Sequence, residues 1–302
     1  MADLERLITE KRNMSTMNLD EMSPYEIITI MNKEDQKVLE AVHDALPQIA
    51  RAIEWTTDSL QKNGRIIYIG AGTSGRLGVL DAVECPPTFG VPYDMVVGVI
   101  AGGKEAFVKA EEGAEDNPEL GREDLKRICL SADDVVIGLA ASGRTPYVIG
   151  ALQYAKEVGC RTIAISCNEN TKISAKADCA IELLTGPEIL TGSTRLKAGT
   201  AEKMVLNMIS TVSMVGIGKV YQNLMVDLRQ TNTKLVTRAE NIVMEAVGCE
   251  RKEAQTALQE AGGGAKLAIT KMLLHCDIET ARKCLEQADE KVRVAVSKRL
   301  TI

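Results

Sequence analysis

Two glycine-rich segments of this sequence carry hydroxyl side chains in a pattern suited to binding a phosphate group. The first, GAGTSG at 70–75, follows an apolar run and places Thr73, Ser74 and Gly75 where a helix is expected to begin. Backbone N–H groups, hydroxyls and the helix dipole all favour an anion at such a position. The segment therefore predicts a site for a phosphate or for sugar hydroxyls.

The second segment repeats this design after another apolar run. In ASGRTP at 141–146, Ser142, Gly143, Arg144 and Thr145 precede a proline that suits the first turn of a helix. Two such turns, each after a parallel strand, lie at the carboxyl edge of one sheet, where open α/β sheets bind ligands. Helix capping would explain either turn alone, but the pair favours a shared phosphosugar site.

A third stretch, TGSTRLK at 191–197, adds further hydroxyls and two cations. We expect Arg195 to bind a substrate carboxylate or phosphate, because a guanidinium contacts either group through two hydrogen bonds. Lys197 has an alternative interpretation as a surface residue at the start of a helix. The sequence likewise does not separate phosphate-binding from sugar-binding roles for Thr73 and Ser74.

A dinucleotide site is the competing interpretation of the first turn, since GAGTSG matches the G-x-G-x-x-G pattern. Such a site needs an acidic residue at the end of the second strand to hold the ribose. That strand ends in IAGG at 100–103 instead, so no nucleotide cofactor is expected. No metal is expected either, because the eight cysteines are scattered as apolar thiols and the two histidines lie away from both turns.

Carboxylates then become the candidates for acid and base chemistry. Glu84 precedes the stiff segment CPP at 85–87, and Glu115 lies in the acidic run EEGAED at 111–116. An acidic run is most often a solvated surface, so composition alone does not assign a function to Glu115.

The elements that must position these residues alternate along the chain. Strands are expected at 65–72, 95–103, 134–142, 162–167 and 179–184, and helices at 35–62, 75–83, 104–114, 120–129, 145–158 and 198–220. Pro47 is a point at which the helix at 35–62 can bend or divide. This alternation indicates an α/β fold with a doubly wound parallel sheet. Residues 1–232 are expected to hold an N-terminal helical arm, over 1–32, and the α/β domain. Residues 233–302 are expected to form a small domain of three helices.

Bulk composition restricts the partners and the location. The net charge is −6 and no long basic run is present, which argues against nucleic-acid binding. No apolar run reaches the length of a membrane span, and the N-terminal residues lack the apolar core of a signal peptide. We therefore expect a cytoplasmic protein that binds a small molecule.

Several strings together resemble a known enzyme family. The paired turns are similar to those of sugar isomerase domains, which bind phosphosugars without nucleotide or metal. The strings GAGTSGRLGVLDAVECPPTFG, VVGVIAGG, EEGAED, AASGRTPYVIGAL and TGSTRLKAGTAEKMVLNM resemble the N-acetylmuramic acid 6-phosphate etherases, from the N-terminal arm to about residue 290. The resemblance implies cleavage of a lactyl ether, giving N-acetylglucosamine 6-phosphate and D-lactate, without a cofactor.

The etherase motifs also imply an acid and a base, at the glutamates of the ECPP and GAED strings. Those residues are Glu84 and Glu115 here. Glu84 is expected to be the acid, since burial beside proline and aromatic surface raises the pKa of a carboxyl group. Glu115, with polar neighbours, is expected to be the base, and Ser142, Gly143 and Thr145 are expected to bind the phosphate.

Two other functions fit the same turns. An aldose–ketose isomerase would use one carboxylate at C2 but no acid for a leaving group, and a phosphosugar-sensing regulator would need neither. The presence of both Glu84 and Glu115 favours the etherase. The similar glucokinase regulatory protein contains two sugar isomerase units, whereas this chain has one. A homodimer with shared sites is therefore expected, and the nearly all-apolar helix at 198–220 supports it.

Overall fold

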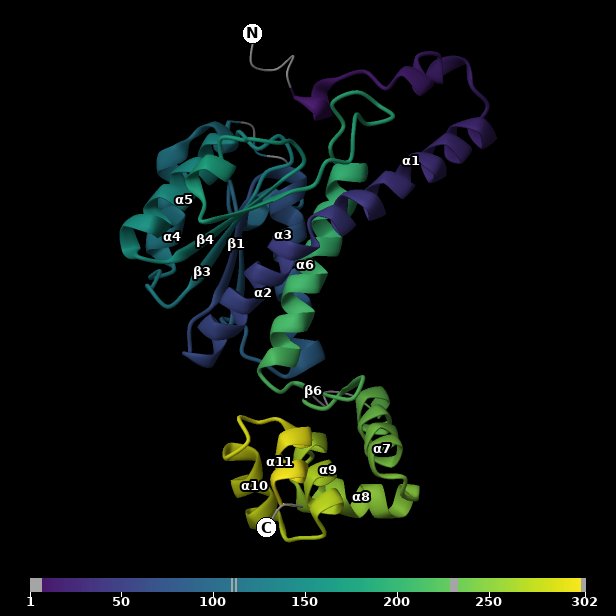
Figure 1. Cartoon of the computed structure of the whole chain (residues 1–302), viewed down its shortest axis with the longest axis vertical. Coiled ribbons are helices and arrows are strands. Elements are labelled where there is room, and N and C mark those ends of the chain that lie inside the picture. The colour runs from purple at the N-terminus through teal and green to yellow at the C-terminus, as the bar shows by residue number, and fades with distance from the viewer. Residues whose placement is uncertain (1–6, 110, 112, 229–232, 300–302) are drawn as a thin grey trace. The chain divides into compact units, whose positions relative to one another are not determined.

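The computed structural model describes residues 7–109, 111, 113–228 and 233–299. Five strands form its main sheet: β1 (Ile66–Gly70), β2 (Val96–Ile100), β3 (Val135–Leu139), β4 (Arg161–Ser166) and β5 (Cys179–Glu182). The helices of the same part of the chain are α1 (Pro24–Asp44), α2 (Leu46–Gln61), α3 (Gly72–Phe89), α4 (Pro118–Arg127), α5 (Pro146–Val158) and α6 (Lys197–Gly216). The α/β prediction is confirmed (Figure 1).

The sheet is parallel throughout, in the order β2-β1-β3-β4-β5. All residues of β1 and β3 are buried, because helices cover both faces and each strand is a continuous apolar run. The strand order reverses between β1 and β3, so their carboxyl ends form the switch point at which doubly wound sheets bind ligands.

Helices α4 and α5 cover one face of the sheet, and α2, α3 and α6 lie on the other (Figure 1). On the first face, Val148 and Leu152 of α5 pack in one fully buried cluster with Ile67 and Val136. Burying an aliphatic side chain of this kind stabilises the fold by about 1.5–3 kcal/mol. This packing holds the start of α5 beside the end of β3.

The N-terminal helices begin earlier than predicted, and the segment at 35–62 is divided near Pro47. It forms parts of two helices, separated at Ala45, with Pro47 in the first turn of α2. Proline fits there because the first turn needs no N–H donor. Helix α1 starts at Pro24 under a capping box between Ser23 and Glu26, so the arm expected over 1–32 ends sooner. Residues 1–6 of that arm lie outside the described residues.

Helix α3 is longer than the predicted 75–83 because it continues through Pro86 and Pro87. These prolines occupy its last turn, and both Pro86 and Phe89 are buried. Tertiary packing therefore outweighs the lost hydrogen bonds, and the helix ends at Phe89, just before Gly90, whose φ is +67°.

Packing divides the chain into two compact units, Met1–Val83 with Asp94–Ser210 and Glu84–Tyr93 with Thr211–Ile302. In its described part the second unit contains a hairpin, β6 (Val220–Tyr221) and β7 (Leu224–Met225), and helices α7 (Thr233–Val247), α8 (Arg251–Glu260), α9 (Ala265–Leu274), α10 (Ile278–Glu286) and α11 (Val292–Arg299). The predicted three helices are wrong for this region, because left-handed residues such as Gly248 and His275 end helices early. The predicted domain boundary, after residue 232, falls outside the described residues.

Candidate functional site

The first turn connects β1 to α3 through a close backbone contact. A Cβ atom on Gly75 would lie 2.7 Å from the carbonyl oxygen of Gly70, so only glycine allows α3 to start this near the strand. Thr73 is half-buried and Ser74 is buried. The first N–H groups of α3 and both hydroxyls therefore lie at the carboxyl end of β1.

The second turn connects β3 to α5. Gly143 has φ of +70°, donates its N–H to Ala140 at 2.8 Å, and would place a Cβ atom 2.3 Å from Thr171. Thr145 is the N-cap residue of α5, but its side chain makes no capping hydrogen bond, so the hydroxyl can serve a ligand. Within the described residues, Nη1 of Arg144 is buried without a hydrogen-bond partner. An unpaired buried guanidinium nitrogen is costly unless an anion binds it.

The sheet places these two turns side by side. Gly70, the last residue of β1, is in register with Leu139, the last residue of β3. Ser142 and Thr145 thus start from the same level of the sheet as Thr73 and Ser74. The two predicted segments therefore adjoin at the switch point, although they are far apart in the sequence.

The third stretch also reaches this region. A Cβ atom on Gly199 would lie 3.4 Å from Cγ2 of Thr73, which puts the start of α6 against the first turn. Arg195 is exposed in the preceding loop. Lys197 is only 1% exposed and its ammonium binds Glu34 of α1 at 2.7 Å, so its interpretation as a surface residue is wrong.

Glu115 lies beside the first turn. It is exposed in a short 3-10 helix, η5 (Ala114–Asp116), and lines a cavity of about 180 Å³ together with Gly72, Arg76 and Glu111. The helix expected at 104–114 is only a 3-10 turn, η4 (Lys104–Phe107), and residues 110 and 112 lie outside the described residues. Arg76 holds this segment in place by donating to the carbonyl oxygen of Phe107 at 2.8 Å.

Glu84 does not have the buried environment that the sequence predicted. It is exposed on α3, so the prediction of a buried carboxyl group is wrong for the single chain. The cause is the unbroken course of α3, which turns Cys85 and Pro86 inward and leaves Glu84 outward. Glu84 also follows Ser74 by ten residues, and ten residues span about 15 Å along a helix axis.

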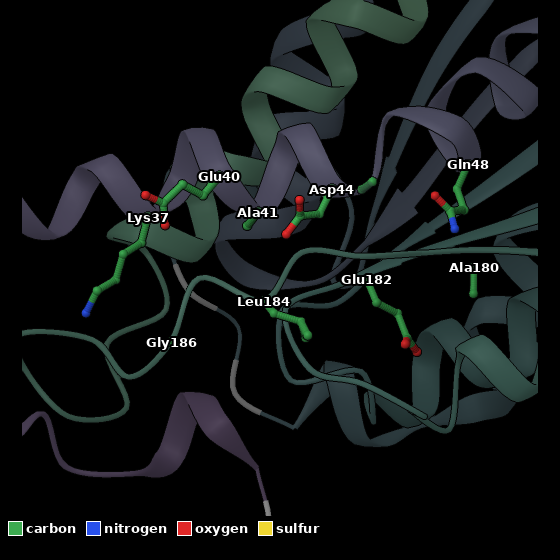
Figure 2. Close-up of a pocket in the computed structure, with 10 residues that line it drawn as sticks. Lys37, Glu40, Ala41, Asp44, Gln48, Ala180, Glu182, Leu184 and Gly186 are labelled. Atoms are coloured by element: carbon green, nitrogen blue, oxygen red, sulfur yellow. The ribbon is translucent and has the colours of Figure 1, made fainter.

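A larger cavity, of about 450 Å³, lies between α1, α2 and β5 and contains no residue of either turn. Figure 2 shows Glu40, Asp44 and Glu182 around it, with Lys37 as the cation. Three carboxylates against one ammonium group repel a phosphate dianion. Electrostatics therefore favour the two turns over this larger cavity as the phosphosugar site.

Two residues that contact the turns were not predicted from the sequence. Asn168, after β4, donates to the carbonyl oxygen of Ala141 at 3.2 Å and accepts the N–H of Ile8 at 2.6 Å, so it joins the N-terminal arm to the second turn. An oxygen of Glu202 in α6 lies 3.0 Å from the hydroxyl oxygen of Ser74, within hydrogen-bond distance. A lone acidic residue within an apolar helix was the available signal for Glu202.

Comparison with known proteins first defines the class. A family model described as "SIS domain" matches residues 119–211, and one described as "Glucokinase regulatory protein N-terminal SIS domain" matches residues 48–156. A phosphoheptose isomerase structure from Francisella tularensis has a TM-score of 0.52 at 15% identity, covering 64% of this chain and 98% of that chain. The fold with its paired turns is thus that of the SIS domain.

Full-length relatives narrow this class. The N-acetylmuramic acid 6-phosphate etherase of Pectobacterium atrosepticum is 57% identical over 294 residues, covering 97% of each chain. A protein of the same name from a Geobacillus strain is 58% identical over 293 residues, covering 97% of this chain and 99% of its own. The chain belongs to the N-acetylmuramic acid 6-phosphate etherase family, which confirms the resemblance.

Proposed function

We propose that this protein cleaves the D-lactyl ether of N-acetylmuramic acid 6-phosphate, giving N-acetylglucosamine 6-phosphate and D-lactate. The observation that carries the proposal is the identity of 57% with a named etherase over 97% of the chain. The geometry supports it, because the hydroxyl-bearing turns adjoin at the switch point and Glu115 lines the cavity at the first of them. The reaction makes the enzyme a carbon–oxygen lyase.

The proposed mechanism avoids direct displacement of a poor alkoxide leaving group. Opening of the pyranose exposes an aldehyde at C1, which makes the C2 proton acidic. Glu115 removes that proton, and the electron pair forms a C2–C3 double bond while the C3–O bond to lactate breaks. Glu84 gives its proton to the departing lactate oxygen. Water then adds at C3 and a proton returns to C2, which completes elimination and hydration by general acid–base catalysis.

Phosphate binding is assigned to the second turn. Ser142 and Thr145 supply hydroxyls, Gly143 and the start of α5 supply N–H groups, and the unpaired Nη1 of Arg144 supplies positive charge. Arg195, which is exposed in the loop before α6, is proposed to bind the lactyl carboxylate.

Assembly into a homodimer would give Glu84 the buried surroundings that it lacks in the single chain. Leu80 and Val83 are 44% and 51% exposed on α3 immediately before Glu84. An apolar surface on a helix favours cover by a partner subunit, and a second copy of this chain is the simplest one. In the dimer, this cover would desolvate Glu84 and keep it protonated as the acid.

The location proposed for this reaction is the cytoplasm. Across the residues that the structure describes, no helix combines the length and apolarity needed to cross a membrane.

Product analysis tests the proposed function. Purified protein incubated with N-acetylmuramic acid 6-phosphate is expected to release D-lactate and N-acetylglucosamine 6-phosphate in equal amounts. Interconversion of aldose and ketose phosphates without lactate release would indicate an isomerase instead. Binding of the phosphosugar without any turnover would indicate a sensor.

A further inference from the structure

Glu202 is a buried carboxyl group that the proposed mechanism does not use. It is 1% exposed, lies in the second turn of α6, and its Oε1 atom is 3.0 Å from the hydroxyl oxygen of Ser74. Its other oxygen, Oε2, is buried without a hydrogen-bond partner among the described residues. The side chain of Glu202 therefore contacts Ser74 of the first turn from α6.

The neutral form of Glu202 is the one that this geometry favours. An ionised carboxylate would leave a charged oxygen buried and unpaired, which is far more costly than a neutral carbonyl oxygen in the same place. Burial accordingly raises the pKa of Glu202 to about 8, against the smaller opposing effect of the Ser74 hydrogen bond. Glu202 is thus mainly protonated at pH 7.

The protonation state of Glu202 sets the direction of the Ser74 hydroxyl. An ionised carboxylate only accepts hydrogen bonds, so Ser74 must give it its single O–H. Because Oε2 has no partner to receive a proton, a protonated Glu202 carries it on Oε1 and donates it to the oxygen of Ser74. The O–H of Ser74 is then free to donate elsewhere. Only in this second arrangement does Ser74 offer a hydrogen to an anion or a sugar oxygen at the turn.

We propose that protonated Glu202 is a positioning residue that directs the O–H of Ser74 toward the bound phosphosugar. This role rests on the proposed function, in which the first turn binds that ligand. It makes affinity for the phosphosugar depend on a proton that never touches the ligand.

Neighbouring groups do not replace Glu202 in this role. Cys167, which follows β4, is fully buried near Glu202, and burial holds the pKa of its thiol well above the usual range. Glu188 also lies near Cys167, but its two oxygens accept the N–H groups of Lys197 and Ala198 at 3.1 and 2.9 Å. Ser74 is the partner that α3 presents to Glu202.

Titration calorimetry with N-acetylglucosamine 6-phosphate between pH 7 and 9 tests the proposal. The phosphate is a dianion throughout this range, so its own titration contributes little. The wild-type protein should bind about fivefold more weakly at pH 9 than at pH 7, because a pKa of about 8 limits the loss to the roughly tenfold fall in the protonated fraction over this range. Glu202→Gln keeps a donor to Ser74 that does not titrate, and its affinity should match wild type at pH 7 and stay constant to pH 9.

The Ser74→Ala variant provides a second test. It should bind N-acetylglucosamine 6-phosphate more weakly than wild type at pH 7, with no further loss of affinity toward pH 9. A fivefold loss that persists in Glu202→Gln or in Ser74→Ala would overturn the proposal, as would a wild-type affinity independent of pH. Circular dichroism melts verify that each variant is folded. A folded wild-type protein that binds no phosphosugar at pH 7 would instead contradict the proposed function, and the positioning role with it.

Discussion

The two carboxylates assigned to the reaction occupy different surroundings at the residue scale. Glu115 lines a cavity at the first turn, whereas Glu84 is exposed on a helix. A general acid must stay protonated near neutral pH, and burial of a carboxyl group favours this. The chemistry therefore predicts that Glu84 acts in an assembled enzyme rather than in an isolated chain.

Replacing Glu84 by alanine separates the two halves of the reaction. Lactate release should fall by about 10²–10⁴-fold, the usual contribution of a positioned acid. Exchange of the C2 proton of N-acetylglucosamine 6-phosphate in deuterated water should continue, because Glu115 performs it alone. Proton NMR measures both quantities. Glu54→Ala, an exposed glutamate on α2, is the matched control, and near-normal lactate release by the Glu84 variant would rule out its role as the acid.

Glu202 also predicts a pH dependence of stability. Its pKa is raised to about 8 in the folded state from an ordinary value of 4.5, so the folded state binds the extra proton between those values. This contribution to stability is fully present below pH 4.5 and is lost as pH rises through 8. Urea unfolding from pH 5 to 9 should show Glu202→Gln gaining stability relative to wild type. A difference that does not change with pH would contradict the buried, protonated state.

At the scale of elements, α3 and α6 are joined by two buried polar contacts. Ser74 binds Glu202 near the start of both helices, and Asp81 accepts the hydroxyl of Ser210 at 3.1 Å about two turns later. Such contacts fix one rotational setting of the helices, because any other would leave buried polar groups unpaired. The first turn is therefore held by α6 as well as by β1.

Gly143→Ala tests the second turn as a structural element. Alanine there would have both a left-handed backbone and a Cβ atom 2.3 Å from Thr171, and we expect a loss of about 2–4 kcal/mol of unfolding free energy. Gly113→Ala is the matched control, since its backbone is left-handed, with φ of +82°, and its Cβ atom meets nothing within 4 Å. Its loss should be about 1–2 kcal/mol. Equal losses in urea unfolding would show that the contact with Thr171 does not constrain the turn.

At the scale of the whole molecule, the proposed homodimer would complete the site. In that dimer the second copy would cover the exposed Leu80 and Val83 of α3, which lie just before the proposed acid. A two-fold dimer would bury equivalent α3 surfaces and give each site residues from both chains.

Sedimentation equilibrium at micromolar concentration should report about twice the chain mass of 32.7 kDa. Mixing the inactive Glu84→Ala and Glu115→Ala subunits, after exchange, should restore about a quarter of the wild-type activity, because half of the dimers then hold one intact site. A wild-type monomer with full activity would contradict the dimer. Dimers whose mixed subunits stay inactive would show that Glu84 and Glu115 act within one chain.

The sequence alone determined the parallel sheet, the two turns and their shared edge, because continuous apolar strands, glycine and hydroxyl residues act through local geometry. It did not determine the course of α3 through Pro86 and Pro87 or the exposure of Glu84, since packing overrode the local preference of proline. Lys197 and Glu202 are likewise explained only by partners far along the chain, Glu34 and Ser74. Whether a charged side chain is buried depends on contacts between distant segments, and only the tertiary structure supplies these.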